Sequence, residues 1–270
     1  MKRLSTIAAV FCFLAAFAFD LGAVQVDENG GVWTIQTDSY ELHFKVAAQA
    51  GYSQVFPSIE AGAESLFGAG QGRNFYHAAN YNGWKDWGTA VDVEEVSNAN
   101  STLIMKYTLD DGDSKVYEVT ATYWDGAPYF KHELVVTAKN AVMSLSDGHE
   151  PMVEPRNGKG AGNQYMEWDA PFPHVAMESD GAYFAMYTEV GTTAFNAAWN
   201  TDGRMHLLHN EQGVNLQADA SSDPLVYYLA IGPGGLDNAH DLAEQVTEEP
   251  ASLSVQPQNK LAARWAELKK

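Results

Sequence analysis

The feature that most constrains this chain is the alternation of apolar and polar residues in several long runs. The clearest runs are Tyr40–Val46, Ser101–Leu109, Val116–Trp124 and Tyr129–Thr137. A period of two places every second side chain on the same face of a β-strand, so each run predicts a strand with one buried face. The segment Asp125-Gly126-Ala127-Pro128 separates two of these runs, and an Asp-Gly pair in such a place is typical of a β-hairpin.

Shorter runs continue the pattern as far as Pro233 and bring the predicted strands to roughly a dozen. No helical period interrupts them, which predicts an all-β fold of antiparallel sheets, packed as a sandwich or closed as a barrel. We expect one large antiparallel β-sandwich over residues 24–235, because no linker rich in Pro, Ser or Gly divides the region. The shorter predicted strands are Val32–Thr37, Gln164–Trp168, Tyr183–Glu189, Met205–His209, Val214–Ala218 and Leu225–Ile231.

Residues 236–270 change to a helical period and predict a short C-terminal helical tail. Leu236–Val246 is expected to form a first helix with Asp237 as its N-cap, and Asn259 can cap a second helix. Two interpretations of the tail stay open: a clip that covers a face or edge of a sheet, or a docking element for a protein partner or the cell envelope. One face of the second helix carries Leu261, Trp265 and Leu268.

Residues 1–23 have the organisation of a secretory signal peptide. The start carries two positive charges, and Leu4–Phe19 is apolar apart from two hydroxyl residues. Small residues favour cleavage after Ala18 or after Ala23, and the mature protein is then expected to be secreted or periplasmic. Cleavage also removes Cys12, the only cysteine, so no disulfide, cysteine nucleophile or thiolate metal site is expected.

The chain is strongly acidic, with 35 Asp and Glu against 16 Lys and Arg and a formal net charge of −19 at pH 7. Such a surface repels a phosphate backbone, so nucleic acid is excluded as the main partner. Hydrophobic residues make up 46% of the chain, which suffices for a sizeable core and argues against disorder. No run after the first segment approaches the about 18 apolar residues of a spanning helix, so no membrane span is expected in the mature chain.

A Trp-bearing strand at Gly31-Val32-Trp33 is followed by the alternating strand Tyr40–Val46, by a loop rich in Gly and aromatic residues, and by long hairpins such as Val116–Thr137. This order resembles the galactose-mutarotase-like β-supersandwich of sugar epimerases, polysaccharide lyases and accessory domains of glycoside hydrolases. The resemblance covers about Gly31–Gly235 and does not include the epimerases' catalytic His and Glu motif. It implies a concave sheet face that holds carbohydrate, and hence a carbohydrate-active or carbohydrate-binding protein.

The densest group of polar and aromatic residues extends from Gln71 to Trp87 and is predicted to be a loop by its Gly and Asn content. Aromatic rings stack on the flat C–H faces of sugars, while amide and guanidinium groups bind sugar hydroxyls. The alternative is an ordered surface loop whose Trp residues plug the end of the sandwich. Candidate ligand-binding residues are Arg73, Asn74, Trp84 and Trp87, and His77 is a candidate catalytic residue.

A second cluster, from His149 to His174, surrounds a Gly-rich loop. Residues two apart share a strand face, so its carboxylates, Arg, Tyr and His side chains are expected to converge and supply general acid and base groups. In the alternative, Glu154 and Arg156 form a solvated pair and His174 lies in a turn. Candidate catalytic residues here are Tyr165, His174, Glu154 and Glu167, and candidate ligand-binding residues are Arg156 and Trp168.

We predict no cofactor, with calcium as the one possible ion. Asp110-Asp111-Gly112-Asp113 lacks the spacing and bidentate Glu of an EF-hand loop, so a solvated hairpin turn is the simpler interpretation. His206 and His209 are three apart and point to opposite faces of a strand, which disfavours a shared metal. No Gly-x-Ser-x-Gly, Walker or His-Glu-x-x-His motif occurs, so serine hydrolase, nucleotide and zincin functions lack support.

Three hypotheses follow for function. The first is an enzyme that acts on an extracellular polysaccharide, either a lyase or a hydrolase with paired carboxylates such as Glu154 and Glu167. The second is a non-catalytic carbohydrate-binding module that uses Trp84, Trp87 and Trp168 as a stacking platform. The third is an envelope assembly protein with contacts through its C-terminal helix. In the lyase, the uronate carboxylate is neutralised by Arg73, Asn74 or Arg156, and the base and acid come from His77, His174 or Tyr165.

Overall fold

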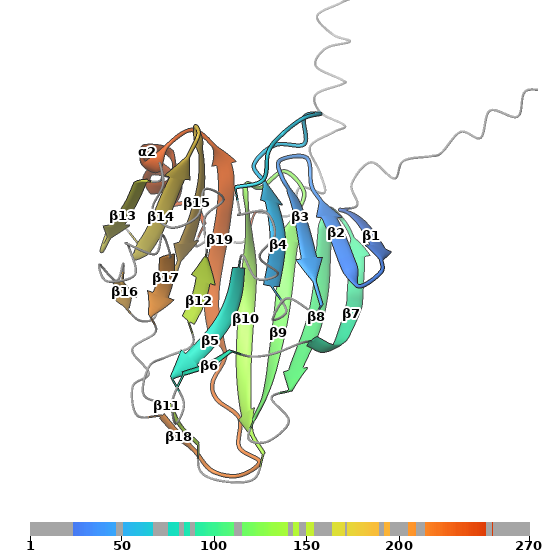
Figure 1. Cartoon of the computed structure of the whole chain (residues 1–270), viewed down its shortest axis with the longest axis vertical. Helices are drawn as coiled ribbons and strands as arrows, with labels where there is room; N and C mark the ends of the chain where they lie inside the picture. Colours follow the sequence, from blue (N-terminus) through green and yellow to red (C-terminus); the bar gives the residue numbers. More distant parts are fainter. Residues whose placement is uncertain are drawn as a thin grey trace, which may run out of the picture.

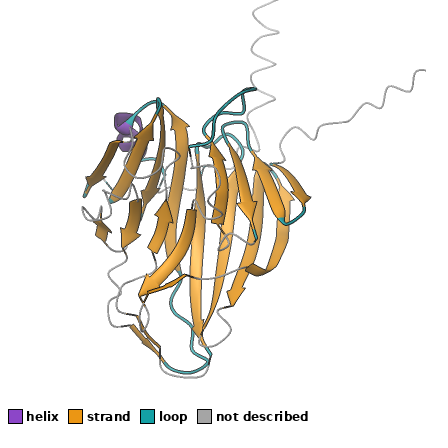
Figure 2. Ribbon diagram, in the orientation of Figure 1, coloured by secondary structure: helices purple, strands orange, loops and turns teal. Residues whose placement is uncertain are grey.

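The computed structural model describes residues 24–46, 51–66, 75–80, 84–86, 90–110, 115–139, 143–145, 150–153, 164–170, 172–188, 192–194, 205–208, 214–246 and 250. Strands dominate these ranges, and one short helix accompanies them (Figure 2). Neighbouring strands pair antiparallel throughout the sheets. The predicted all-β antiparallel sandwich is therefore confirmed.

The largest sheet has eight strands, in the order β13-β14-β15-β19-β10-β9-β8-β7 (Figure 1). Its two edges are the five-residue strand β13 and the long strand β7. The strands are β7 (Ala90–Ala99), β8 (Thr102–Asp110), β9 (Lys115–Trp124), β10 (Tyr129–Ala138), β13 (Gln164–Trp168), β14 (His174–Ser179), β15 (Ala182–Tyr187) and β19 (Leu225–Pro233).

Three smaller sheets accompany the large one. A four-stranded sheet has the order β1-β2-β3-β4, a five-stranded sheet the order β16-β17-β12-β5-β6, and β11 pairs with β18. Their strands are β1 (Gln25–Asn29), β2 (Val32–Gln36), β3 (Glu41–Lys45), β4 (Gly51–Phe56), β5 (Phe75–Asn80), β6 (Trp84–Asp86), β11 (Met143–Leu145), β12 (Glu150–Val153), β16 (Thr192–Ala194), β17 (Met205–Leu208) and β18 (Val214–Leu216).

The main core lies between the eight-stranded and four-stranded sheets. Alternate residues of β8 from Leu103 to Leu109 are buried, together with Leu42 and Phe44 of β3. We call the face of the eight-stranded sheet that joins this core the inner face. On β14 and β15 it carries Val175, Met177, Phe184 and Met186.

A hydrogen-bonded polar network crosses this core. His132 Nε2 lies 2.8 Å from the Tyr52 hydroxyl, and His132 Nδ1 lies 2.9 Å from the Tyr227 hydroxyl. The hydroxyls of Tyr52 and Tyr123 are 2.6 Å apart. All four side chains are fully buried, and buried polar atoms that bond to one another in this way tie β4, β9, β10 and β19 together.

Part of the outer face of the eight-stranded sheet is covered by α2 (Leu236–Leu242), which contacts β13, β14, β15 and β19. Leu236, Ala239 and Leu242 face a second core cluster that includes Tyr183 and Tyr187 of the outer face. The helix begins after Gly235 and not at the predicted N-cap Asp237, and turns extend the predicted segment to Val246. None of the helices in the described ranges is long and apolar enough to cross a membrane.

The edge strand β7 differs from the strands beside it. Its side chains from Asp92 to Ala99 are mostly exposed, and its pairing with β8 is interrupted by two register shifts. Three exposed carboxylates lie along it: Asp92, Glu94 and Glu95.

Several predictions fall outside the described residues. They are the signal peptide over 1–23, the second tail helix from Asn259, and the turn residues Asp111 to Asp113. Each of them stays a prediction, as do the proposed domain boundaries at 23 and 235.

Candidate functional site

Four aromatic rings form a stack between the outer face of β13–β15 and α2. The Trp168 and His174 rings are 4.5 Å apart with their planes at 13°, and His174 and Tyr187 are 5.0 Å apart at 20°. His240 of α2 lies 5.1 Å from Trp168 and 5.3 Å from His174, at 19° and 22°. We call these four residues the ring stack.

Strand register explains why these rings meet. His174 on β14 pairs directly with Trp168 on β13 and with Tyr187 on β15, and residues opposite one another in neighbouring strands share a face. The α2 backbone then brings His240 onto the same face, because the Tyr187 hydroxyl donates a 2.6 Å hydrogen bond to the Ala239 carbonyl.

The His174 imidazole is fully buried and has a partner at each nitrogen. Its Nδ1 lies 2.6 Å from the Phe172 carbonyl oxygen, and its Nε2 lies 3.3 Å from His240 Nδ1. Burial is the main cause that lowers the pKa of His174 from 6.5 to about 4. The ring is therefore neutral near pH 7, and both of its nitrogens face protein groups.

The other two candidates on β13 lie on the inner face. Tyr165 is half-buried against the main core and pairs with Met177, while Glu167 is exposed and pairs with Val175. Tyr165 and Glu167 therefore share a face, as their spacing predicts. The expected convergence with His174 is not found, because the sheet itself separates His174 and Trp168 from Tyr165 and Glu167.

The five-stranded sheet is a neighbour of this part of the large sheet, since β16 contacts β13 and β14, and β17 contacts β14 and β15. Two candidates belong to it: His77 on β5 pairs with Pro151, and Trp84 on β6 pairs with Asn80. The prediction of a loop is therefore wrong for these two strands, because pairing with β12 and with each other outweighs the local Gly and Asn content. Only the backbone of these strands is described. The remaining candidates, Arg73, Asn74, Trp87, Glu154 and Arg156, lie outside the described residues.

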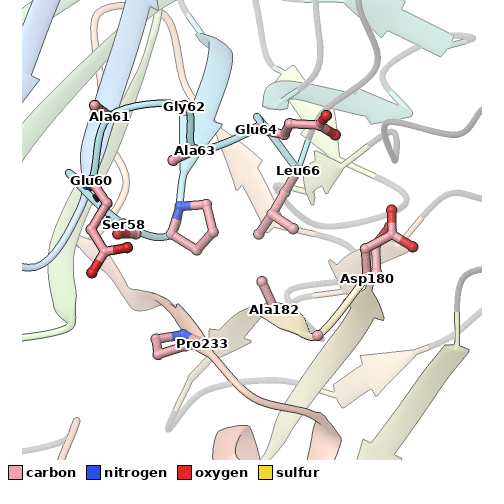
Figure 3. Close-up of a pocket in the computed structure, with 13 residues that line it drawn as sticks. Ser58, Glu60, Ala61, Gly62, Ala63, Glu64, Leu66, Asp180, Ala182 and Pro233 are labelled. Atoms are coloured by element: carbon pink, nitrogen blue, oxygen red, sulfur yellow. Dashed lines mark hydrogen bonds between the residues drawn. The ribbon is translucent and has the colours of Figure 1, made fainter.

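A separate pocket of about 440 Å³ opens between the Pro57–Leu66 loop and the β14–β15 turn (Figure 3). Leu66, Ala182 and Pro233 supply apolar walls. Its polar lining is acidic and consists of Glu60, Glu64, Asp180 and the hydroxyls of Ser58 and Ser179. Among the described residues, no three His, Cys, Asp or Glu side chains are grouped so as to hold a metal ion.

Sequence reasoning missed this pocket and half of the ring stack. The pair Asp180-Gly181 was a usable sign of a hairpin beside the predicted Tyr183–Glu189 strand. The sequence of β15 is AYFAMY, apolar at every position, and an unbroken apolar strand requires a covering element on both faces of the sheet. That requirement is the signal that would have brought His240 and Tyr187 together.

No protein-family model matches the sequence, and no curated protein matches it either. Solved structures do match, at the level of the fold. The chain is similar to the GH36 α-galactosidase AgaB from Geobacillus stearothermophilus, with 8% identity, a TM-score of 0.53, and coverage of 79% of this chain and 42% of that one.

An α-galactosidase from Lactobacillus brevis matches with 12% identity and a TM-score of 0.51, over 80% of this chain and 41% of that one. A polysaccharide lyase matches with 13% identity and a TM-score of 0.51, over 76% of this chain and 34% of that one. The chain thus spans about two fifths or less of the length of these proteins. The predicted likeness to the galactose-mutarotase-like sandwich is confirmed for the fold.

Proposed function

We propose that this protein acts on an extracellular polysaccharide, with its ligand site on the inner face of β13. The observation that supports the site is the placement of Tyr165 and Glu167 side by side on that face. The likeness of the fold to α-galactosidases and to a polysaccharide lyase supports the class of ligand. Since fold likeness alone does not carry an activity, the residues must be tested directly.

The reaction we propose is β-elimination. A base removes the C5 proton of a uronate, the C4–O bond to the leaving sugar breaks, and a C4–C5 double bond forms while an acid protonates the leaving oxygen. The Tyr165 hydroxyl is the proposed base or acid on β13, and His77 of β5 is its proposed counterpart. Arg73 or Arg156 would stabilise the charge of the uronate carboxylate.

A second candidate function is non-catalytic binding of a neutral polysaccharide. It is favoured by the formal net charge of −19, because a negative surface slows the approach of a uronate polymer. In this function Glu167 and Tyr165 would bind sugar hydroxyls without turnover.

Mass spectrometry of products tests both functions. The full chain is incubated with a panel of neutral and uronate-containing polysaccharides, and fragments with an unsaturated end support the lyase. Saturated fragments would point to a hydrolase instead. Binding without fragments from any substrate supports the non-catalytic function.

Substitutions on β13 test the site. Tyr165→Phe is expected to lower lyase turnover at least about 100-fold, the usual contribution of a positioned acid or base. Glu167→Gln should weaken binding. The matched control is Met166→Gln, because Met166 lies on the same strand, is 46% exposed and faces the opposite side. If all three substitutions change turnover and binding equally, the ligand site is not on the inner face of β13.

A further inference from the structure

We propose that His174 and His240 form a pH-sensitive latch, which holds α2 and the edge strand β13 against the sheet at neutral pH and releases them in acid. The latch stands on the geometry of the ring stack. Its effect on a ligand rests in addition on the proposed function, because β13 carries Tyr165 and Glu167.

The donor and the acceptor of each hydrogen bond in the latch follow from the chemistry of the groups. A carbonyl oxygen only accepts, so His174 Nδ1 must carry the proton that bonds to the Phe172 oxygen at 2.6 Å. In the neutral ring, His174 Nε2 then has a lone pair. His240 Nδ1, 3.3 Å away, must donate to it.

This direction makes the two histidines respond differently to acid. Protonation of His240 leaves its Nδ1–H in place, so its hydrogen bond to His174 survives. Protonation of His174 adds a proton at Nε2, which faces the Nδ1–H of His240. The hydrogen bond is then lost, because two N–H groups face each other, and the new charge on His174 lies 5.3 Å from the His240 ring.

The groups that face His174 do not offset its charge. Trp168 of β13 cannot ionise, and burial raises the pKa of Tyr187 of β15 well above its usual value, so that side chain stays neutral. The positive charge of His240 on α2 further lowers the pKa of His174. On its own strand, the carboxylate of Glu178 accepts the Leu236 N–H at the start of α2, at 3.2 Å.

The elements that the latch holds depend on their contacts with the sheet. At seven residues α2 is shorter than the about 12 residues that an isolated helix needs in water, so it depends on its packing. β13 pairs with β14 alone in the eight-stranded sheet, and on the outer side its Trp168 ring stacks on both histidines. Release of α2 therefore removes support from the strand that carries the proposed ligand face.

Hydrogen exchange of backbone amides tests the latch in the full chain. Because His174 has a depressed pKa, the released form binds one more proton than the latched form between pH 6.5 and about 4. The opening equilibrium then rises by up to tenfold per pH unit, and by about 40-fold from pH 6.5 to pH 4.5. After correction for intrinsic rates, α2 and β13 should lose protection by this factor and should remain less protected than β9 and β10, which exchange only when the core opens.

His174→Phe should abolish this pH step because it keeps a ring in the stack and removes the titrating group. His43→Phe is the matched control, since His43 lies on β3 and pairs with Glu41, and it should leave the step unchanged. Protection of α2 and β13 that persists to pH 4, or that equals the protection of β9 and β10 at pH 4.5, would overturn the latch.

A second measurement on the unsubstituted protein covers the case in which His174→Phe does not fold. Nitrogen chemical shifts should show His174 protonated at Nδ1 and not at Nε2 near pH 7. A proton at Nε2, or titration of His174 near 6.5, contradicts the proposal. Polysaccharide binding at pH 6.5 and 4.5 is measured separately: a pH step in exchange without binding at either pH sustains the latch and rejects the proposed function.

Discussion

At the scale of single residues, His132 is the most consequential polar side chain of the core. His132→Phe keeps a ring of similar size but leaves the Tyr52 and Tyr227 hydroxyls without their imidazole partner. Loss of these buried hydrogen bonds is expected to lower the free energy of unfolding by about 2–4 kcal/mol. Urea unfolding followed by circular dichroism measures the change.

The control for this substitution is His43→Phe. His43 lies on β3 with a quarter of its side chain exposed, and it pairs with Glu41 at 2.7 Å. A partly exposed pair contributes about 1 kcal/mol at most. If both substitutions lower the free energy equally, the network is not what stabilises the core.

The buried tyrosines give a prediction at alkaline pH. Burial raises the pKa of Tyr183 to about 12 and that of Tyr52, Tyr107 and Tyr227 well above 10. Above pH 10 the unfolded chain therefore loses protons that the folded chain retains, so stability is full below pH 10 and falls as pH rises through the folded-state pKa. Absorbance at 295 nm should show these tyrosines ionising only with unfolding, and ionisation of all tyrosines near pH 10 in the folded protein would contradict this.

Single residues also mark a limit of sequence reasoning. His132 and His174 are both buried strand residues, yet one bonds to tyrosine hydroxyls in the main core and the other stacks beneath α2. A period of two tells which residues share a face of one strand. It does not tell which face meets the other sheet and which meets a helix encoded 60 residues later.

At the scale of elements, the β14–β15 hairpin has a two-residue turn in which both residues have positive φ, 51° at Asp180 and 75° at Gly181. A Cβ at Gly181 would meet no neighbouring atom, so Gly181→Ala tests the backbone conformation alone. The substitution is expected to cost about 1–2 kcal/mol of unfolding free energy. Thermal unfolding checks the value.

Asp180→Asn is the control for the turn, because Asn tolerates the left-handed conformation at least as well as Asp. Its effect should stay within about 0.5 kcal/mol. If Gly181→Ala lowers the free energy of unfolding by no more than this amount, the turn conformation carries no strain for Ala.

The elements that sequence reasoning found and missed differ in their surroundings. β8, β9 and β10 follow the predicted alternation because one face meets the core and the other is partly exposed. β14 was missed because five of its six residues are buried, with α2 covering the outer face, and because it lacks the unbroken apolar run AYFAMY of the equally buried β15. A strand buried on both faces has no alternation to detect.

At the scale of the whole molecule, the net charge of −19 sets the salt dependence of ligand binding. Screening lengths shrink to about 8 Å at 0.15 M salt, so repulsion between the protein and a uronate polymer weakens as salt is added. Affinity for such a polymer should rise about threefold between 20 and 150 mM NaCl, whereas affinity for a neutral polysaccharide should not change. Calorimetric titration at both salt concentrations measures these affinities. A fall in the affinity for the uronate polymer with added salt would instead indicate a local positive site.

The fold as a whole was more accessible from the sequence than the site. The sandwich architecture is predicted by the alternating pattern of many strands together. An error in the prediction of one strand therefore leaves the predicted fold class unchanged. The site depends on how Tyr165, Glu167, Trp168 and His174 are divided between two faces, and that division is set by packing across sheets. The spacing of Tyr165 and Glu167 was informative because it concerns a single strand.

The strand β7 forms one edge of the eight-stranded sheet. β7 presents a row of backbone groups to solvent, the kind of edge on which one protein copy can add to another and seed fibrils. Its exposed Asp92, Glu94 and Glu95, together with the two register shifts, make that edge charged and irregular. The acidity of the chain therefore also protects this edge against aggregation.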